Sequence, residues 1–230
     1  MITFQELLIG KGGETSCRLC ARKIDEGVPA PLSDIEQRIT EIVSQSEEAT
    51  SLSVMMTGFE PFMHPDLVQI VSALTHAGVR QIGMRTNGRA LGNPQAAQGC
   101  IDAGVRVFEI PFFAGSAELS DRLSGIPGLF QTSQAGVKQV IESSSNLQVK
   151  TFVSALIPLC SHNRDELILA TQTALAVGVQ AIRIQAAIPG RIDPAALDAA
   201  HTLATRSGVA FFGDACDAYI KGASLYEVIV

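Results

Sequence analysis

The sequence predicts an α/β protein whose parallel strands form a partial (β/α)6-type barrel. Two observations support this class. Short apolar runs rich in Val, Ile and Phe alternate along the chain with amphipathic segments at helical spacing. The chain has 230 residues and shows no low-complexity stretch or shift in composition, which fits one large α/β domain. We therefore expect a single domain over residues 1–230.

The predicted strands alternate with helices, and such strands pair in parallel because each helix carries the chain back across the sheet. Six or seven of these units favour an open barrel, and a flat doubly wound sheet is the alternative. In both folds ligands bind where the strands end, so the loops there carry the chemistry. The apolar runs lie at residues 6–10, 52–58, 81–86, 105–113, 149–157, 181–188 and 209–213.

Four predicted helices carry explicit start and stop signals. A capping box formed by Ser33 and Glu36 predicts the start of the first helix. Pro65 suits the first turn of the second helix, and Gly78 suits its end because glycine tolerates the left-handed conformation there. The third helix has the caps Asn163 and Glu166 and ends at Gly178, and the fourth starts at Asp193-Pro194 and ends at Gly208.

The composition limits the class of function. The formal net charge is −6 and no basic run exists, so we expect no nucleic acid as a partner. No apolar run reaches the ~18–20 residues of a membrane span, and residues 1–6 do not resemble a signal peptide. Five cysteines in a chain of this size fit a reducing compartment better than a disulfide framework. We expect a cytoplasmic protein with no membrane partner.

Unusual residues gather in the segments that follow the predicted strands. The first strand leads into a segment with a close cysteine pair, Cys17 and Cys20. Alone, this pair would also fit half of a zinc site or a redox dithiol, although zinc takes four ligands and the chain has no second C-x2-C. The later segments contain Gly58-Phe59-Glu60-Pro61, Thr86-Asn87-Gly88 and a stretch from Asp121 to Phe130.

This order of motifs resembles the radical SAM superfamily, whose first loop is usually C-x3-C-x2-C and whose second strand ends in G-G-E-P. A T-N-G segment ends the third strand in that superfamily, and D-x-x-T-G-x-P-G-x-F follows the fourth strand in many members. The resemblance covers residues 9–189. It implies a 4Fe–4S cluster held by thiolates, and S-adenosylmethionine that is reductively cleaved to a 5′-deoxyadenosyl radical.

By this resemblance Cys17 and Cys20 are the second and third cluster ligands, and Gly13 stands at the position of the first. Gly58 and Glu60 match the G-G-E-P segment, and Glu60 would accept a hydrogen bond from the methionine ammonium group. Polar residues on the inner face of later strands are candidates for the remaining contacts with S-adenosylmethionine. They are Asn87, Ser154, Arg183 and Gln185. No residue is assigned a catalytic role.

Gly13 leaves two functional hypotheses open, because glycine has no side-chain ligand atom. The first is an active radical SAM enzyme that acts on a peptide or small-molecule substrate, with a partner protein or electron donor. The second is a catalytically inactive barrel that serves as a binding or scaffold subunit. A third, an unrelated lyase or aldolase barrel, ranks last because only Lys150 lies in a predicted strand.

Several of these residues also have a purely structural interpretation. His64 precedes a proline and more often caps a helix or anchors a loop than acts as a base. Arg183 and Gln185 share a strand face and would fill the barrel if they paired with each other, although buried polar groups of this kind still imply a polar cavity. The remaining cysteines, Cys100, Cys160 and Cys216, fit small core residues.

Overall fold

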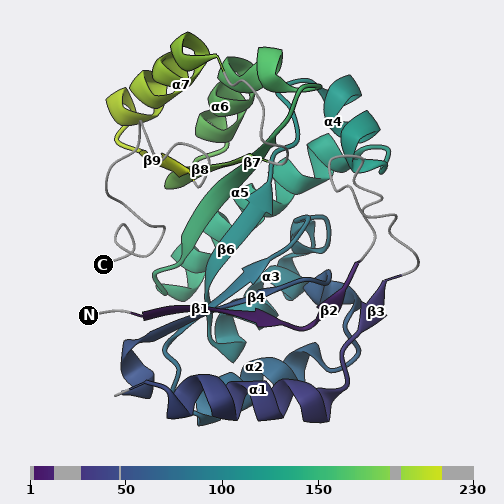
Figure 1. The fold of residues 1–230 in the computed structure, drawn as a ribbon, viewed down its shortest axis with the longest axis vertical. Coiled ribbons are helices and arrows are strands. Elements are labelled where there is room, and N and C mark those ends of the chain that lie inside the picture. Colours follow the sequence, from purple (N-terminus) through teal and green to yellow (C-terminus); the bar gives the residue numbers. More distant parts are fainter. Residues whose placement is uncertain (1–2, 13–26, 47, 187–192, 214–230) are drawn as a thin grey trace.

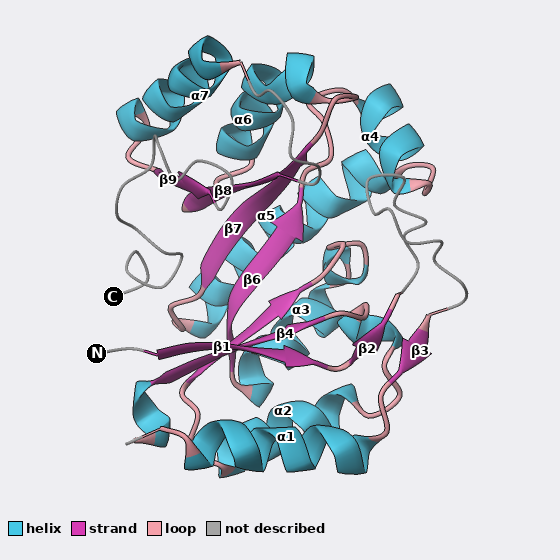
Figure 2. Ribbon diagram, viewed as in Figure 1, coloured by secondary structure: helices cyan, strands magenta, loops and turns pink. Residues whose placement is uncertain are grey.

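The computed structural model describes residues 3–12, 27–46, 48–186 and 193–213. These residues form a curved sheet of seven parallel strands with helices packed against its outer face (Figure 1), and strands, helices and loops are distinguished by colour in Figure 2. A short antiparallel ladder of β2 (Gly10–Lys11) and β3 (Val28–Pro29) follows the first strand. The strands of the sheet are β1 (Thr3–Leu8), β4 (Leu52–Thr57), β5 (Gln81–Arg85), β6 (Val105–Pro111), β7 (Phe152–Leu159), β8 (Ala181–Ala186) and β9 (Ala210–Gly213).

The strands follow one another across the sheet in chain order, β1-β4-β5-β6-β7-β8-β9. A doubly wound sheet reverses this order once, which puts helices on both of its faces. Without a reversal, right-handed crossovers place the connecting helices on one face, and the other face curls inward as the interior of a barrel. Within the described part of the chain, β1 and β9 are the edge strands, and the barrel is open between them. The predicted partial barrel is confirmed, with seven strands in place of six.

The helices cover the outer face of the sheet (Figure 2). Two predicted boundaries are confirmed. The side chain of Asp193 caps the last helix by accepting a hydrogen bond from the N–H of Ala195 at 3.0 Å, and Gly78 follows the second helix with a φ of +86°. The helices are α1 (Leu32–Ser44), α2 (Leu67–His76), α3 (Pro94–Ala103), α4 (Ala117–Ser124), α5 (Leu129–Leu147), α6 (Leu167–Ala176) and α7 (Pro194–Arg206).

Two of the predicted helix caps are wrong. Pro31 occupies the N-cap position of α1, which places Ser33 inside the first turn, where its hydroxyl donates to Asp34 Oδ1 instead of capping the helix. Asn163 and Glu166 precede α6 without capping it through their side chains. Their side chains bind other backbone groups: Asn163 binds those of Cys160 and Phe113, and Glu166 accepts from the N–H groups at 115 and 116. These partners compete with the local cap.

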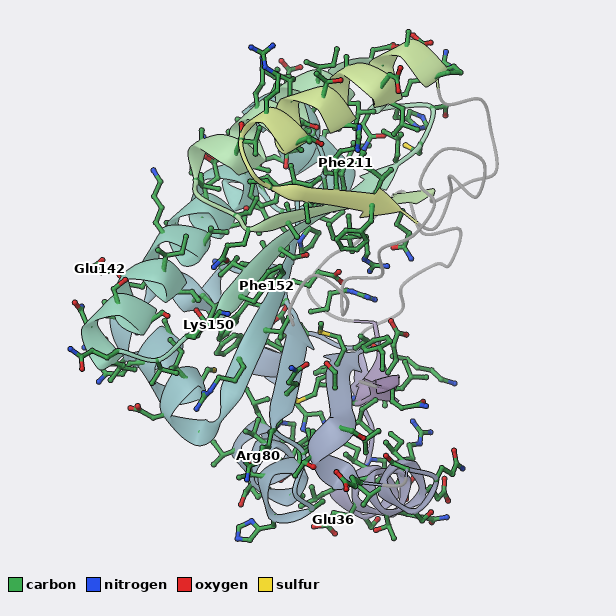
Figure 3. The ribbon with its side chains drawn as sticks, turned by 90° about the vertical axis from the view of Figure 1, so that its left-hand side faces the viewer. Glu36, Arg80, Glu142, Lys150, Phe152 and Phe211 are labelled. Atoms are coloured by element: carbon green, nitrogen blue, oxygen red, sulfur yellow. The ribbon has the colours of Figure 1, made fainter. Side chains whose placement is uncertain are left out.

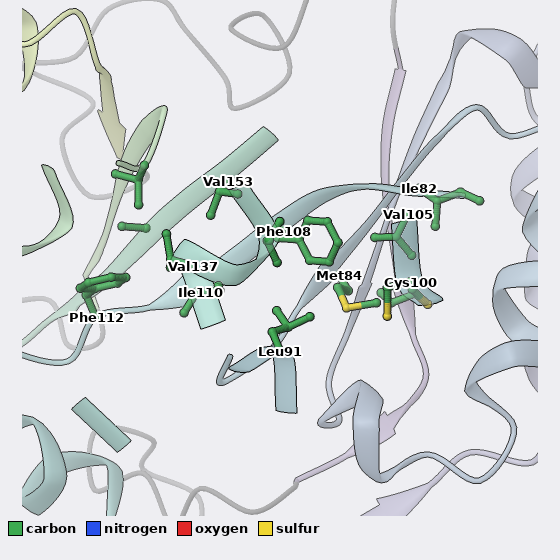
Figure 4. Close-up of a cluster of buried hydrophobic side chains, with 14 of the residues drawn as sticks. Ile82, Met84, Leu91, Cys100, Val105, Phe108, Ile110, Phe112, Val137 and Val153 are labelled. Atoms are coloured by element: carbon green, nitrogen blue, oxygen red, sulfur yellow. The ribbon is translucent and has the colours of Figure 1, made fainter. Parts of the chain in front are cut away.

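The main hydrophobic core lies between the outer face of the sheet and the helices. Phe108 of β6 and Met84 of β5 have no exposed surface, and Leu91 and Val137 pack against them from the helical side (Figure 4). Burying a side chain of this size contributes roughly 1.5–3 kcal/mol. This core attaches the helices to the sheet and leaves the inner face available for a site.

A second, smaller apolar cluster, here called the floor cluster, lies on the inner face of the sheet. It consists of Met55, Val107, Ala181 and Phe212, with Phe4, Phe152 and Ala210 packed against them. Val107, Phe152 and Ala181 each lie two residues before a polar inner-face residue on the same strand. The floor cluster therefore fills the amino-terminal end of the barrel, and the polar residues lie nearer the carboxyl ends of the strands.

Three charged side chains labelled in Figure 3 lie at the periphery of the molecule. Glu36, Glu142 and Lys150 are exposed and lie on its outside, whereas Phe152 and Phe211 lie along the sheet (Figure 3). In the described part of the chain, no helix has the length and apolar character needed to cross a membrane.

A glycine on α5 determines how closely this helix approaches the Thr86-Asn87-Gly88 turn that follows β5. Gly136 is buried, and a Cβ atom built on it would collide with the carbonyl group of Gly88. The atoms it would meet belong to the backbone, so rotation of a side chain cannot relieve the collision. Gly136 therefore sets the distance between α5 and a turn at the carboxyl end of the sheet.

Replacement of Gly136 by alanine is expected to lower the free energy of unfolding by about 1–3 kcal/mol, because the methyl group meets the backbone of Gly88. Gly99→Ala on α3 is the matched control. A Cβ atom there has nothing within 4 Å, and alanine favours a helix interior by roughly 0.5–1 kcal/mol over glycine. Chemical denaturation of both variants measures the difference. Equal unfolding midpoints for the two variants would contradict the close approach of α5.

Candidate functional site

Two of the predicted motifs meet at the carboxyl ends of β4 and β5. The carboxylate of Glu60 accepts a hydrogen bond from Thr86 Oγ1 at 2.6 Å and another from the N–H of Asn87 at 2.8 Å. A longer contact, at 3.4 Å, comes from the N–H of Phe62. Thr86 and Asn87 are buried, and Glu60 is half-buried. The segment after β4 is thus fixed against the turn after β5.

The Thr86-Asn87-Gly88 turn is also stabilised from within. Asn87 Oδ1 accepts a hydrogen bond from the N–H of Arg89 at 2.9 Å, and Thr86 Oγ1 accepts one from the N–H of Gly88 at 3.3 Å. Gly88 has a φ of +78°, a conformation that glycine adopts without strain. Asn87, predicted as a cofactor contact, therefore has a defined structural role at the mouth of the barrel.

Residues 13–26, which contain the predicted cluster cysteines, lie outside the described residues. The chain on both sides of them is held in one place. β2 and β3 pair as an antiparallel ladder, and the N–H of Ala30 donates to the carbonyl of Ile9 at 2.9 Å. Ile9 in turn donates its N–H to the carbonyl of Thr57, the last residue of β4, at 3.0 Å. The two described segments that flank residues 13–26 therefore meet at the carboxyl ends of β1 and β4.

The segment after β4 anchors this ladder. Gly58 has a φ of +87°, and a Cβ atom on it would lie 2.5 Å from the carbonyl oxygen of Gly10, so only glycine fits. His64 Nδ1 accepts from the N–H of Asp66 at 3.1 Å, which places the ring proton on Nε2, and Nε2 donates to the carbonyl of Ala30 at 3.1 Å. His64 is buried and acts as a loop anchor, one of its predicted structural roles.

A buried carboxylate lies at the centre of the polar inner face. Glu109 of β6 has no exposed surface. It accepts two hydrogen bonds from Arg183 of β8, from Nε at 2.8 Å and from Nη2 at 2.9 Å. It also accepts from Nε of Arg85, the last residue of β5. Arg85 reaches further to Glu6 of β1, at 3.2 Å. Four strands are therefore linked by one ionic network.

The charges of this network determine the ionisation of Glu109. Burial alone would raise the pKa of this carboxyl group, but the positive charges of Arg85 and Arg183 and the hydrogen bonds that they donate outweigh burial. The pKa of Glu109 is held below its usual value. Glu109 is therefore an anion at neutral pH, and its contacts are charge-assisted.

The remaining predicted inner-face residues lie around this network. Ser154 on β7 is fully buried and pairs in register with Glu109 on one side and Ala181 on the other. Its hydroxyl finds no hydrogen-bond partner within the described part of the chain. Gln185 on β8 is half-buried and lies two residues closer to the carboxyl end than Arg183. Arg183 is paired with Glu109, which corrects the interpretation that it pairs with Gln185.

Sequence reasoning did not assign Glu109 to the site, although a signal for it was present. Glu109 lies two residues after Val107 and therefore on the same, inner face of β6. Arg85 and Arg183 occupy inner-face positions of other strands. Buried guanidinium groups need a counter-charge. An acidic residue at an inner-face position was therefore the expected partner.

Two other acidic residues shape the loops at the same end of the barrel. Asp121 accepts hydrogen bonds from the N–H groups of Gly128 at 2.6 Å and Phe130 at 2.9 Å. Glu166 accepts from the N–H groups of Gly115 at 3.0 Å and Ser116 at 2.9 Å. These carboxylates satisfy backbone donors in turns. The stretch from Asp121 to Phe130 thus fixes a loop, in agreement with its structural interpretation.

The predicted metal ligands, Cys17 and Cys20, lie outside the described residues. So does Gly13, which stands at the position of the first expected cluster cysteine. Among the residues that are described, no group of three or more His, Cys, Asp or Glu side chains could hold a metal ion. Cys100 and Cys160 are free and buried, as expected of core residues. Burial raises the pKa of Cys100 to about 11, so it is a neutral thiol at physiological pH and a poor ligand.

The partial barrel and the motifs at its strand ends agree with comparison to known families. The radical SAM superfamily matches residues 7–173, which is more than half of the chain. The chain therefore belongs to the radical SAM superfamily. This superfamily uses a 4Fe–4S cluster together with S-adenosylmethionine, the two cofactors expected from the sequence.

Two curated relatives carry the name AdoMet-dependent heme synthase. The protein from Oleidesulfovibrio alaskensis is 29% identical over 140 residues, which is 60% of this chain and 35% of that protein. The protein from Methanosarcina barkeri is 27% identical over 186 residues, which is 79% of this chain and 50% of that protein. The chain thus spans half or less of the length of these relatives.

Solved structures of low sequence identity share the fold. Streptococcus suis SuiB bound to the precursor peptide SuiA has a TM-score of 0.69 and 13% identity, and the match covers 94% of this chain and 50% of SuiB. Methylornithine synthase (PylB) has a TM-score of 0.63 and 11% identity, with 98% of this chain and 76% of that protein covered. At this identity the likeness establishes the barrel architecture alone.

The ionic network predicts a pH-dependent stability. The pKa of Glu109 is lower in the folded chain than its ordinary value of 4.5, so its ionised form stabilises the fold fully above about pH 4.5, and this contribution is lost as the pH falls through the folded pKa. Glu109→Gln removes the contribution. We expect this variant to be less stable than the unsubstituted chain near neutral pH, and the difference to narrow in acid. Denaturant titrations at neutral pH and at about pH 3–4 measure it. A difference that does not change with pH would contradict the ion pair.

Proposed function

We propose that this chain is the barrel core of a radical SAM enzyme that generates a 5′-deoxyadenosyl radical by reductive cleavage of S-adenosylmethionine. The supporting observation is the convergence of Glu60, the turn at Asn87 and a polar barrel interior at the carboxyl ends of the strands, in a chain of this superfamily. When bound, the 4Fe–4S cluster supplies the electron that cleaves the sulfonium group of S-adenosylmethionine.

The described interior fits a ligand with hydroxyl, carboxylate and ammonium groups. Ser154 Oγ and Thr57 Oγ1 are buried and find no hydrogen-bond partner in the described part of the chain. Buried hydroxyls in proteins normally have one, so these two atoms suit a polar ligand or water inside the barrel. The guanidinium group of Arg183 lies on the same inner face as Ser154. The floor cluster lines the amino-terminal end of the barrel with apolar side chains.

Each predicted residue then has a proposed task. Glu60 accepts from the ammonium group of the methionine moiety, and its bonds to the turn after β5 hold its carboxylate in place for this contact. Gly58 allows the backbone to approach the ladder beside residues 13–26. Four inner-face residues contact the ribose and carboxylate of S-adenosylmethionine, namely Asn87, Ser154, Arg183 and Gln185. The thiolates of Cys17 and Cys20 bind the cluster.

The proposed substrate is a peptide or a small molecule. Curated relatives carry the name of a heme synthase, and SuiB, which shares the fold, was solved with a precursor peptide, so both classes have support among similar proteins. Reductive cleavage also consumes an electron from outside the cluster. We therefore include an electron-donor protein among the proposed partners.

Gly13 supports one competing function, a catalytically inactive barrel that serves as a binding or scaffold subunit. Three thiolates leave one iron of the cluster for S-adenosylmethionine, whereas Cys17 and Cys20 alone leave two irons without a thiolate. The active-enzyme proposal therefore requires a further ligand at the cluster, from this chain, from solution or from a partner. The substitution Gly13→Cys restores the missing thiolate and separates the two functions.

The proposed function predicts that the chain, reconstituted anaerobically with iron and sulfide and then reduced with dithionite, releases 5′-deoxyadenosine from S-adenosylmethionine. We expect Gly13→Cys to raise the bound iron and the product yield, because a third thiolate completes the usual ligand set. Iron and sulfide analysis and chromatography of the product measure both. Bound iron and 5′-deoxyadenosine in Gly13→Cys alone would favour the scaffold function for the unsubstituted chain. If neither the unsubstituted chain nor Gly13→Cys binds iron or releases 5′-deoxyadenosine, the enzyme function is ruled out.

A further inference from the structure

The contacts proposed for S-adenosylmethionine do not explain why Glu109 is buried in the barrel. We propose that Glu109 is a positioning residue, which clamps Arg183 and Arg85 and thereby presents a fixed guanidinium group and the neighbouring Ser154 hydroxyl to S-adenosylmethionine. This inference rests on the proposed function, because it takes that cofactor as the ligand. It assigns a task to a residue that has no other role in the site.

The clamp has a defined geometry. Glu109 contacts Arg183 through both of its carboxylate oxygens, and the two donors, Nε and Nη2, lie on one edge of the guanidinium group. Such a bidentate pair fixes the plane of the guanidinium as well as its position. The opposite edge of Arg183 is consequently held in one orientation. Arg85 donates a third hydrogen bond to the same carboxylate, so Glu109 itself cannot rotate independently.

The position of the clamp suits contact with a ligand at the mouth of the barrel. The ion pair between β6 and β8 spans β7, where Ser154 is the register partner of Glu109. The floor cluster lies on the amino-terminal side of this ion pair. Asn87, which is bound to Glu60 through its N–H, lies two residues beyond Arg85 on the other side. The clamp therefore lies between the floor cluster and Asn87, at the level of Ser154, and includes Arg183, one of the proposed cofactor residues.

The energetics of buried ions favour a role beyond stability. A buried ion pair contributes little more than well-packed apolar side chains of the same volume, because desolvation offsets most of the attraction. The floor cluster shows that apolar residues fill this barrel well at neighbouring positions. Glu109 has no exposed surface and is matched by two arginines, whereas the second carboxylate of the network, on Glu6, is 45% exposed. Among the described residues, the network pairs its one fully buried carboxylate with two arginines, an arrangement that suits a second carboxylate such as that of the methionine moiety.

Fixing an arginine in advance also strengthens binding. An arginine side chain has many rotamers, and an unrestrained side chain loses this conformational entropy when it binds a ligand. In this barrel the folded chain has already restricted Arg183 and Arg85 before a ligand arrives. The cofactor therefore meets a preorganised donor set. If the clamp only filled space, its loss would change the stability and leave the affinity for the cofactor unaltered.

The test measures the affinity for S-adenosylmethionine of the full chain, reconstituted with its cluster, by equilibrium dialysis without a reductant. Glu109→Gln keeps the size of the side chain and removes its charge. We expect it to raise the Kd about tenfold, the loss that corresponds to one misaligned charge-assisted hydrogen bond. The control is Glu118→Gln on α4, whose carboxylate pairs with Arg122 on the surface at 3.5 Å. We expect this control to change the Kd by less than about twofold.

A double variant tests whether Glu109 acts through Arg183. Arg183→Lys keeps the positive charge and removes the bidentate geometry, so we expect it to raise the Kd by a similar factor. The double variant is expected to bind no more than about twofold more weakly than Arg183→Lys alone, because the two residues act as one unit. Losses that multiply in the double variant would overturn the clamp.

Other outcomes are equally decisive. An unchanged Kd in a folded Glu109→Gln chain would overturn the positioning role while leaving the proposed function intact. If Glu109→Gln does not fold, Arg183→Lys carries the test, and an unchanged Kd in that variant overturns the inference. An unsubstituted chain that takes up a cluster and binds no S-adenosylmethionine would overturn the proposed function, and the positioning role with it.

Discussion

The polar interior of the barrel depends on compensating the charge of one carboxylate. Glu109 has no contact with solvent, and an isolated anion there would be strongly destabilising. Arg85 and Arg183 provide the compensation from β5 and β8, and Arg85 links the network to Glu6 on β1. This pairing requires the sequential parallel order, which curls the strands so that their inner faces meet. The ionic network and the barrel closure therefore support each other.

The motif residues connect the loops at the carboxyl ends of the strands. Glu60 joins the segment after β4 to the turn after β5, and Gly58 and His64 join the same segment to the ladder around residues 13–26. Each of these contacts is structural, and none conflicts with a ligand role for the same residue. A carboxylate that is already oriented by Asn87 binds an ammonium group with less loss of freedom than a mobile one.

The parallel barrel, the strand positions and the facing of Ser154 and Arg183 were predictable from the sequence, because helical spacing and strand alternation are local signals. The inner-face arginines indicated that an acidic partner was needed, but the sequence did not show that Arg183 pairs with Glu109, since these two residues are 74 positions apart and meet only when the sheet curls. The cap predicted at Asn163 was wrong for a similar reason. Its side chain instead accepts from the N–H of Cys160 in the same loop and donates to the carbonyl of Phe113, a contact that depends on tertiary structure. The ligand roles of Cys17 and Cys20 remain predictions, because they lie outside the described residues.

The most direct test of the account is a crystal structure of the anaerobically reconstituted chain with S-adenosylmethionine. The account predicts the cofactor at the carboxyl ends of the strands, with its ammonium group within hydrogen-bond distance of the Glu60 carboxylate and its polar groups facing Ser154 and Arg183. Cofactor bound at the outer surface, or bound at the strand ends with Glu60 turned away from it, would contradict the account.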